Sequence, residues 1–167
     1  MALLAGLQAS VTSLEHKTNL DQIHLFTIDL NTRSISAPPE FQDFIGVVGE
    51  HKSETLTFQC DRYYDTVDLA RMMIVVEYIN ADGEGRVSPI IMRDYTTFKD
   101  KIIFDWIIDS AMTGTAGIVQ FDVRFYMIGA KLDDGGSPLV YSLRTLPYRT
   151  KVVDTLPIDM KRMSLEY

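Results

Sequence analysis

The chain of 167 residues has one cysteine, one tryptophan and three histidines. A single cysteine, Cys60, excludes an intrachain disulfide. The apolar runs are short, as in 72–76, so none predicts a bilayer span and no membrane partner is expected. Basic residues are also scarce: 16 Lys and Arg stand against 23 Asp and Glu, a net charge of −7. Attraction to phosphate would oppose this charge, so we expect no nucleic-acid partner.

Residues for ligand chemistry are equally few. His16, His24 and His51 lie in three different predicted elements, without a second ligand at metal spacing, so no metal site is expected. The glycines of 83–85 and 114–117 lack the Gly-Lys-Ser/Thr ending of a phosphate loop. Carboxylates lie in loops or beside basic residues, and Cys60 shares its parity with apolar neighbours. We therefore predict no cofactor and no enzymatic activity, and a buried, unreactive Cys60.

What the chain does contain is the composition of a compact globular domain, 46% hydrophobic and 23% charged. We predict a helical arm over 1–20, a β-sandwich over 21–155 and an extended tail over 156–167. The first residues, Met-Ala-Leu-Leu, carry no basic segment, so no signal peptide is predicted and synthesis in a cytoplasm is expected.

The N-terminal arm is predicted from a helical repeat of apolar residues. Their spacings of 3, 4 and 3 are those of a coiled-coil seam: Leu4, Leu7, Val11 and Leu14. So short a helix is marginal alone, and its apolar stripe needs cover from its own domain or from sister copies. The sequence leaves both alternatives open.

From residue 22 the period changes to 2 and predicts a series of strands. The segments are 22–30, 54–60, 72–79, 87–93, 101–107, 117–128, 139–146 and 148–153. The clearest is 117–128, where apolar and polar residues alternate as in an antiparallel strand with one face on a core. The segments 80–85 and 131–138 are predicted hairpin loops, and 36–39 a rigid joint. Trp106 shares its parity with Ile102 and Phe104, which predicts that it is buried.

Two groups of residues are candidate protein contacts. Tyr63 and Tyr64, beside arginine and aspartate, suit a protein interface because tyrosine and arginine are amphipathic anchors. The structural alternative makes Asp65 and Asp68 turn residues and folds one tyrosine onto the core. Residues 139–167 carry a net charge of +2, which leaves −9 on 1–138. The basic residues Arg149, Lys151, Lys161 and Arg162 therefore either dock on an acidic neighbour or form a solvated terminus.

The order of these features resembles structural proteins of tailed phages and prophages, and most nearly the N-terminal domain of phage baseplate upper proteins. The resemblance covers roughly residues 45–145. The segments that carry it are 50–58, 61–65, Val67-Asp68-Leu69, Ile79-Asn80-Ala81-Asp82-Gly83, 101–106 and 117–123. It implies an antiparallel Ig-like β-sandwich that attaches fibre-like parts to a virion through protein contacts. No residue of the pattern performs chemistry.

The resemblance leads us to expect a virion structural subunit assembled in the host bacterial cytoplasm. The domain is not followed by a long receptor-binding region, so an adaptor or accessory role in the tail or baseplate is expected. A capsid decoration or head-fibre protein is one alternative, and a carbohydrate-binding module for host adsorption is another. We expect contacts with other virion proteins and with copies of itself, with a trimer as the first expectation.

Overall fold

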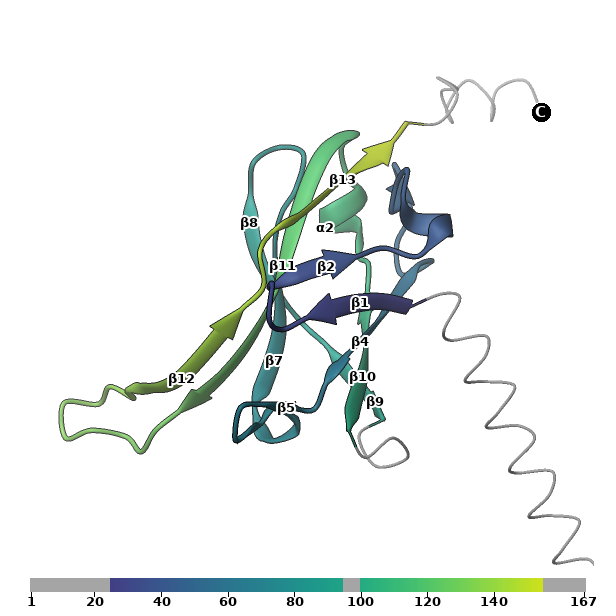
Figure 1. Ribbon diagram of the computed structural model, residues 1–167. Coiled ribbons are helices and arrows are strands. Elements are labelled where there is room, and N and C mark those ends of the chain that lie inside the picture. Colours follow the sequence, from purple (N-terminus) through teal and green to yellow (C-terminus); the bar gives the residue numbers. More distant parts are fainter. Residues whose placement is uncertain (1–24, 95–99, 155–167) are drawn as a thin grey trace, which may run out of the picture.

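The structure is a computed structural model that describes residues 25–94 and 100–154. Within these ranges the chain is mainly β, which confirms the predicted class (Figure 1). The strands are β1 (Leu25–Asp29), β2 (Ser34–Ser36), β3 (Gly46–Val47), β4 (Thr55–Asp61), β5 (Tyr63–Tyr64), β6 (Val67–Asp68), β7 (Met73–Ile79), β8 (Gly85–Pro89), β9 (Ile91–Asp94), β10 (Lys101–Ile107), β11 (Gly117–Ile128), β12 (Leu139–Arg144) and β13 (Tyr148–Val153). The helical turns are η1 (Pro39–Phe41), η2 (Leu69–Arg71) and α2 (Ser110–Thr113).

The strands form two main sheets and one small hairpin. The first sheet has the order β2-β1-β4-β10-β9, and the second has the order β3-β13-β11-β7-β8 with β12 paired to β11. The strands β5 and β6 pair only with each other. β12 and β13 follow one edge of β11 in succession, so the long strand β11 has β7 on one side and these two strands on the other.

The two main sheets pack against each other through aromatic side chains. Phe58 of the first sheet lies edge-on to Phe121 of the second, with ring centroids 5.9 Å apart. Phe104 contacts Phe125 in the same way at 6.3 Å. All four rings are at most 1% exposed, so each buries a large apolar surface between the layers. The core is therefore β-sandwich-like.

The predicted alternation in β11 is confirmed. Its core-facing residues are Val119, Phe121, Val123 and Phe125, which are buried, and Met127, which is half-buried. The residues of opposite parity face outward, but Asp122 is only 9% exposed although it lies on this outer face. Other side chains on that face therefore cover it, as described below.

Trp106 and Cys60 are buried as predicted, at 1% and 2% exposure. The indole Nε1 of Trp106 donates a 3.0 Å hydrogen bond to Ser88 Oγ, across from the first sheet to the second. This satisfies the one polar atom of the ring. Burial also raises the pKa of the Cys60 thiol far above its ordinary value, so the reactive thiolate form is suppressed.

The expectation of a wholly antiparallel sandwich is wrong, because two strand pairs are parallel. β1 pairs parallel with β4, and β13 pairs parallel with β3. A parallel pair needs a long connection, and residues 30–54 supply one between β1 and β4 by passing through β2, η1 and β3. The alternation that marks an antiparallel strand carries no information on this connection.

The predicted single strand over 87–93 is also wrong. β8 ends at Pro89 in the second sheet, and β9 begins at Ile91 in the first, so the chain changes sheet between them. Proline lacks a backbone donor and is confined to edge positions, and β8 is an edge strand. The predicted helical arm and the predicted C-terminal tail lie outside the described residues.

Candidate protein-contact site

The predicted tyrosine pair lies in the small β5–β6 hairpin. Tyr63 is 49% exposed, whereas Tyr64 packs against the core. Asp65, between the two strands, has a φ of 53°, and Asp68 caps η2 by accepting from the Ala70 amide. The structural interpretation is therefore confirmed for these aspartates and for one tyrosine. Tyr63 remains available for a contact.

An arginine fixes this hairpin from its base. Arg62 donates two hydrogen bonds of 2.9 Å to the carboxylate of Asp68, one to each oxygen. This bidentate pair lowers the pKa of Asp68, with help from the Ala70 amide. The Arg62 guanidinium also lies over the Tyr63 ring at 5.3 Å. The arginine predicted as a contact anchor therefore serves the fold of this segment.

The other predicted contact residues are separated from the tyrosines. Arg149 and Lys151 are exposed on the outer face of β13, in register with Gln120 and Ile118 of β11. Leu4, Leu7, Val11 and Leu14 lie outside the described residues, as do Lys161 and Arg162. The structure thus brings Arg149 and Lys151 together, but not with Tyr63 or Tyr64.

The most prominent feature of the molecule is a hairpin that the sequence did not single out as a contact. β11 and β12 run past the end of β7 and extend away from the two sheets (Figure 1). We call residues 126–141 the projecting hairpin. The tip is held by hydrogen bonds from Gly129 N to Pro138 O at 2.8 Å and from Gly135 N to Leu132 O at 2.9 Å. Its loop is therefore shaped by its own backbone.

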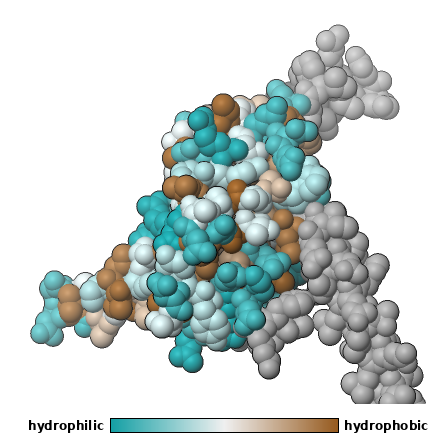
Figure 2. Space-filling view, viewed as in Figure 1, coloured by the Kyte–Doolittle hydropathy of each residue, from teal (hydrophilic) through white to brown (hydrophobic). Residues whose placement is uncertain are grey.

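The projecting hairpin exposes large apolar side chains. They are Ile128 at 47%, Leu132 at 51%, Leu139 at 53% and Val140 at 62% exposure. Figure 2 shows apolar surface along the hairpin, well away from the body. A two-stranded ribbon has no core of its own and is at best marginally stable in water. Apolar side chains in this position are typical of a surface that another molecule covers.

A groove of about 370 Å³ lies on the outer face of the second sheet, where ionisable groups converge. Arg144 contacts Asp122 Oδ2 through Nη2 at 3.0 Å and Glu77 Oε1 through Nε at 3.2 Å. Arg124 lies 3.8 Å from Glu77 Oε2. Glu77 and Asp122 are cross-strand neighbours, so the two carboxylates share one arginine between them.

Asp122 is the perturbed member of this cluster. Its Oδ1 is buried and accepts no hydrogen bond from the described residues. Burial raises the pKa of Asp122, the hydrogen bond from Arg144 opposes the rise, and the charge of Glu77 adds to it. The arginines neutralise both carboxylates, and the groove lining contributed by the described residues includes no histidine, cysteine, serine or threonine to act as a nucleophile or proton shuttle. The arrangement suits ionic recognition better than acid–base chemistry.

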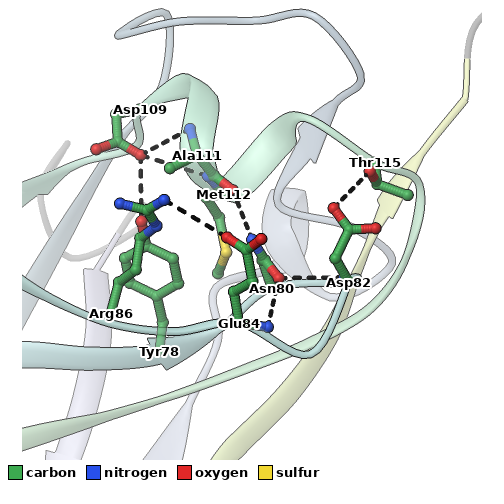
Figure 3. Close-up of polar contacts among 9 residues, drawn as sticks. All are labelled: Tyr78, Asn80, Asp82, Glu84, Arg86, Asp109, Ala111, Met112 and Thr115. Atoms are coloured by element: carbon green, nitrogen blue, oxygen red, sulfur yellow. Dashed lines mark hydrogen bonds and ion pairs between the residues drawn. The ribbon is translucent and has the colours of Figure 1, made fainter.

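A second polar cluster explains part of the Asn-Ala-Asp-Gly segment (Figure 3). Asn80 Oδ1 accepts from the amides of Asp82 at 3.1 Å and Glu84 at 2.9 Å, which shapes the β7–β8 turn. Asp109 Oδ1 accepts from the amides of Ala111 and Met112 and caps α2. These side chains are engaged with backbone groups, so the cluster is structural.

Candidate metal ligands do not gather in the described ranges, where no group of three or more histidine, cysteine, aspartate or glutamate residues is placed to hold an ion. His51 accepts a 2.9 Å hydrogen bond from the Ser110 amide at Nδ1. His16 and His24 are outside the described residues. In the part of the chain that is described, no helix is long and apolar enough to cross a bilayer.

Sequence reasoning missed both the hairpin surface and the groove. The turn chemistry of 131–138 predicted the hairpin itself, but nothing in the sequence indicated that its apolar side chains would be exposed. The groove depends on the strand order, which places Glu77, Asp122 and Arg144 side by side. Comparisons of this chain with family models, curated proteins and solved structures find no match.

Proposed function

We propose that this chain is a non-enzymatic structural subunit that assembles through protein–protein contacts. The observation that carries the proposal is the projecting hairpin, which exposes four large apolar side chains on a ribbon without a core. In an isolated molecule such a surface leaves apolar side chains in water, whereas in an assembly a neighbouring molecule covers them. A scaffold filled by aromatic side chains then holds the hairpin in a fixed direction.

The assembly that we propose is a bacteriophage virion, with the chain as an adaptor or accessory protein of the tail or baseplate. The resemblance of residues 45–145 to baseplate upper proteins supports this assignment, and an Ig-like arrangement of the sandwich belongs to the same proposal. Capsid decoration is the alternative location. Two sheets packed on an aromatic core, with contact surfaces at the periphery, suit either place.

A carbohydrate-binding role receives less support. Sugar-binding sandwiches present aromatic rings in a row on one face, whereas Trp106 is 1% exposed. Among the described aromatic side chains, Tyr63 and Phe44 are the large exposed ones, at 49% and 39%. They come from different hairpins and loops, so a stacking platform is not evident in them.

The virion proposal is tested with purified phage particles from a host that carries the gene. Particles banded in a density gradient are probed with an antibody against the chain and by quantitative mass spectrometry. We expect the chain to band with the particle at a fixed ratio to the known tail proteins. A chain that stays in the soluble lysate fraction would contradict the assignment.

A further inference from the structure

We propose that the projecting hairpin of one copy of this chain docks in the groove on the second sheet of another copy. The inference rests on the proposed function, because it names the partner for the hairpin surface. It commits to a second copy of the same chain as the occupant of the groove.

The groove has an apolar rim that suits an apolar ribbon. Ile79 and Val87, at 40% and 64% exposure, line it together with Pro147. Ile118, at 63%, lies beyond Gln120 on the same face of β11 and extends the apolar area. A docked hairpin would cover these side chains and would bury its own Leu132, so a single contact removes apolar area of both surfaces from water.

The charges of the two surfaces are complementary. The outer face around the groove carries four basic side chains against two acidic ones: Arg124, Arg144, Arg149 and Lys151 against Glu77 and Asp122. Within the described ranges, Arg149 and Lys151 have no ion-pair partner. The tip of the hairpin carries Asp133 and Asp134 against a single Lys131. An acidic tip therefore meets a basic face, which favours this pairing and its orientation.

The hairpin does not reach the groove of its own chain. Gln120 of the groove and Ile128 of the hairpin lie on the same strand, eight residues and so about 26 Å apart at the rise of a β-strand. The hairpin formed by β11 and β12 points away from the body (Figure 1). The occupant of the groove must therefore come from another molecule.

A contact between two different surfaces of one chain is heterologous. Such contacts close into a ring when the rotation between copies allows it and otherwise continue as a filament. Every copy in the ring then has its hairpin covered and its groove filled. A ring-shaped or tubular part of a particle is built from repeated contacts of this kind.

Charge reversal on the full-length chain tests the inference. The hairpin variant carries Asp133→Lys and Asp134→Lys, and the groove variant carries Arg149→Glu and Lys151→Glu. We expect each variant alone to lose at least tenfold in self-association, measured by sedimentation velocity. We expect an equal mixture of the two to assemble again, because each hairpin then meets a groove of opposite charge.

A control variant with Asp61→Lys and Asp100→Lys changes the net charge as the hairpin variant does, at exposed sites at one end of the first sheet, whereas both tested surfaces belong to the second. It should assemble like the wild type, and thermal melting should show all variants folded. A groove variant that assembles normally would overturn the docking, as would a mixture that stays monomeric. Neither result would touch the virion proposal, which depends on particle composition. A monomeric wild type would overturn the docking even if the chain bands with the particle.

Discussion

The side-chain amide of Asn80 donates a 3.1 Å hydrogen bond to the backbone carbonyl of Ala111. This bond ties the β7–β8 turn to helix α2, and the two bonded residues are 31 positions apart in the chain (Figure 3). The same side chain accepts two amide hydrogen bonds inside the turn, and it is 7% exposed. One residue therefore fixes both the shape of the turn and its place on the sandwich.

Replacing Asn80 with alanine should destabilise the fold by about 2 kcal/mol, because three partly buried backbone groups lose their partner. Urea unfolding at neutral pH measures the effect. The matched control is Asp82→Ala in the same turn, which removes only the exposed hydrogen bond to Thr115 and should cost less than about 0.5 kcal/mol. Equal losses in the two variants would refute the role assigned to Asn80.

Stability at high pH should depend on Tyr78. Burial raises the pKa of Tyr78 to about 12, and the charge of Asp109 adds to the rise. The folded chain then keeps the phenol proton at pH values where the unfolded chain, with a pKa near 10, has lost it. The folded state binds more protons in this window, so the free energy of unfolding falls as pH rises from about 10 to about 12.

Tyr78→Phe should make that fall shallower. Unfolding in urea at a series of pH values from about 8 to about 12 provides the comparison, with Tyr63→Phe as the control at an exposed position. If the slopes of Tyr78→Phe and the wild type coincide, Tyr78 does not govern the alkaline limit.

The contribution of Asp122 to the free energy of unfolding should fall as pH rises. A carboxylate in an ordinary ion pair has a lowered pKa, and its contribution is lost as pH falls. Because the pKa of Asp122 is raised above its ordinary 3.8, the unfolded chain ionises first as pH rises. The folded state binds more protons there, and stability is lost as pH rises through the raised value. Asp122→Asn should abolish this loss and leave the variant at least as stable as the wild type at pH 7. Unfolding curves at pH 3 to 7 test this, with exposed Asp133→Asn as the control.

In the same unfolding experiment Arg144→Met should lower stability at pH 7, whereas Asp122→Asn should not. The carboxylates of Glu77 and Asp122 would lose their shared arginine, at a cost of about 1–3 kcal/mol at pH 7. The cost should shrink toward pH 3, because the pKa of Asp122 is raised and its carboxyl group is protonated there. A cost that is independent of pH would show that Arg144 acts through packing alone.

The described core begins at Leu25, so a chain without residues 1–20 should still fold, with a thermal midpoint close to that of the full chain. Reduced oligomeric order would support a contact role for Leu4, Leu7, Val11 and Leu14. Light scattering on the truncated chain measures its mass. An unchanged mass would remove these residues from the account of assembly.

Much of the fold was readable from the sequence because period and turn chemistry are local. The alternation in 117–128, the parity of Trp106 with Phe104, and the glycine and aspartate residues of 80–85 each predicted what the structure has. The parallel pairs and the change of sheet at Pro89 were missed, because they depend on how distant segments meet.

The contact surfaces were harder to predict for the same reason. In the sequence Ile128 and Leu139 resemble ordinary strand residues. The pairing of β7 with β11 reaches only to Met73 and Tyr126, so Ile128 lies beyond the strand that flanks β11 on that side. Likewise, Asp122 reads as a solvated outer residue. It becomes buried because Glu77 and Arg144 arrive beside it from other strands. Exposure of an apolar residue and burial of a charged one are both tertiary properties.

The mass of the full-length chain in solution, with and without an apolar hairpin, tests the central claim most directly. The test variant carries Leu132→Ser, Leu139→Ser and Val140→Ser, all at exposed positions that leave the core intact. By sedimentation velocity we expect the wild type to have a multiple of the 18.9 kDa chain mass, and the variant to have the mass of one chain with an unchanged melting temperature. A wild type and a variant of the same mass would contradict the claim that this hairpin is the assembly contact.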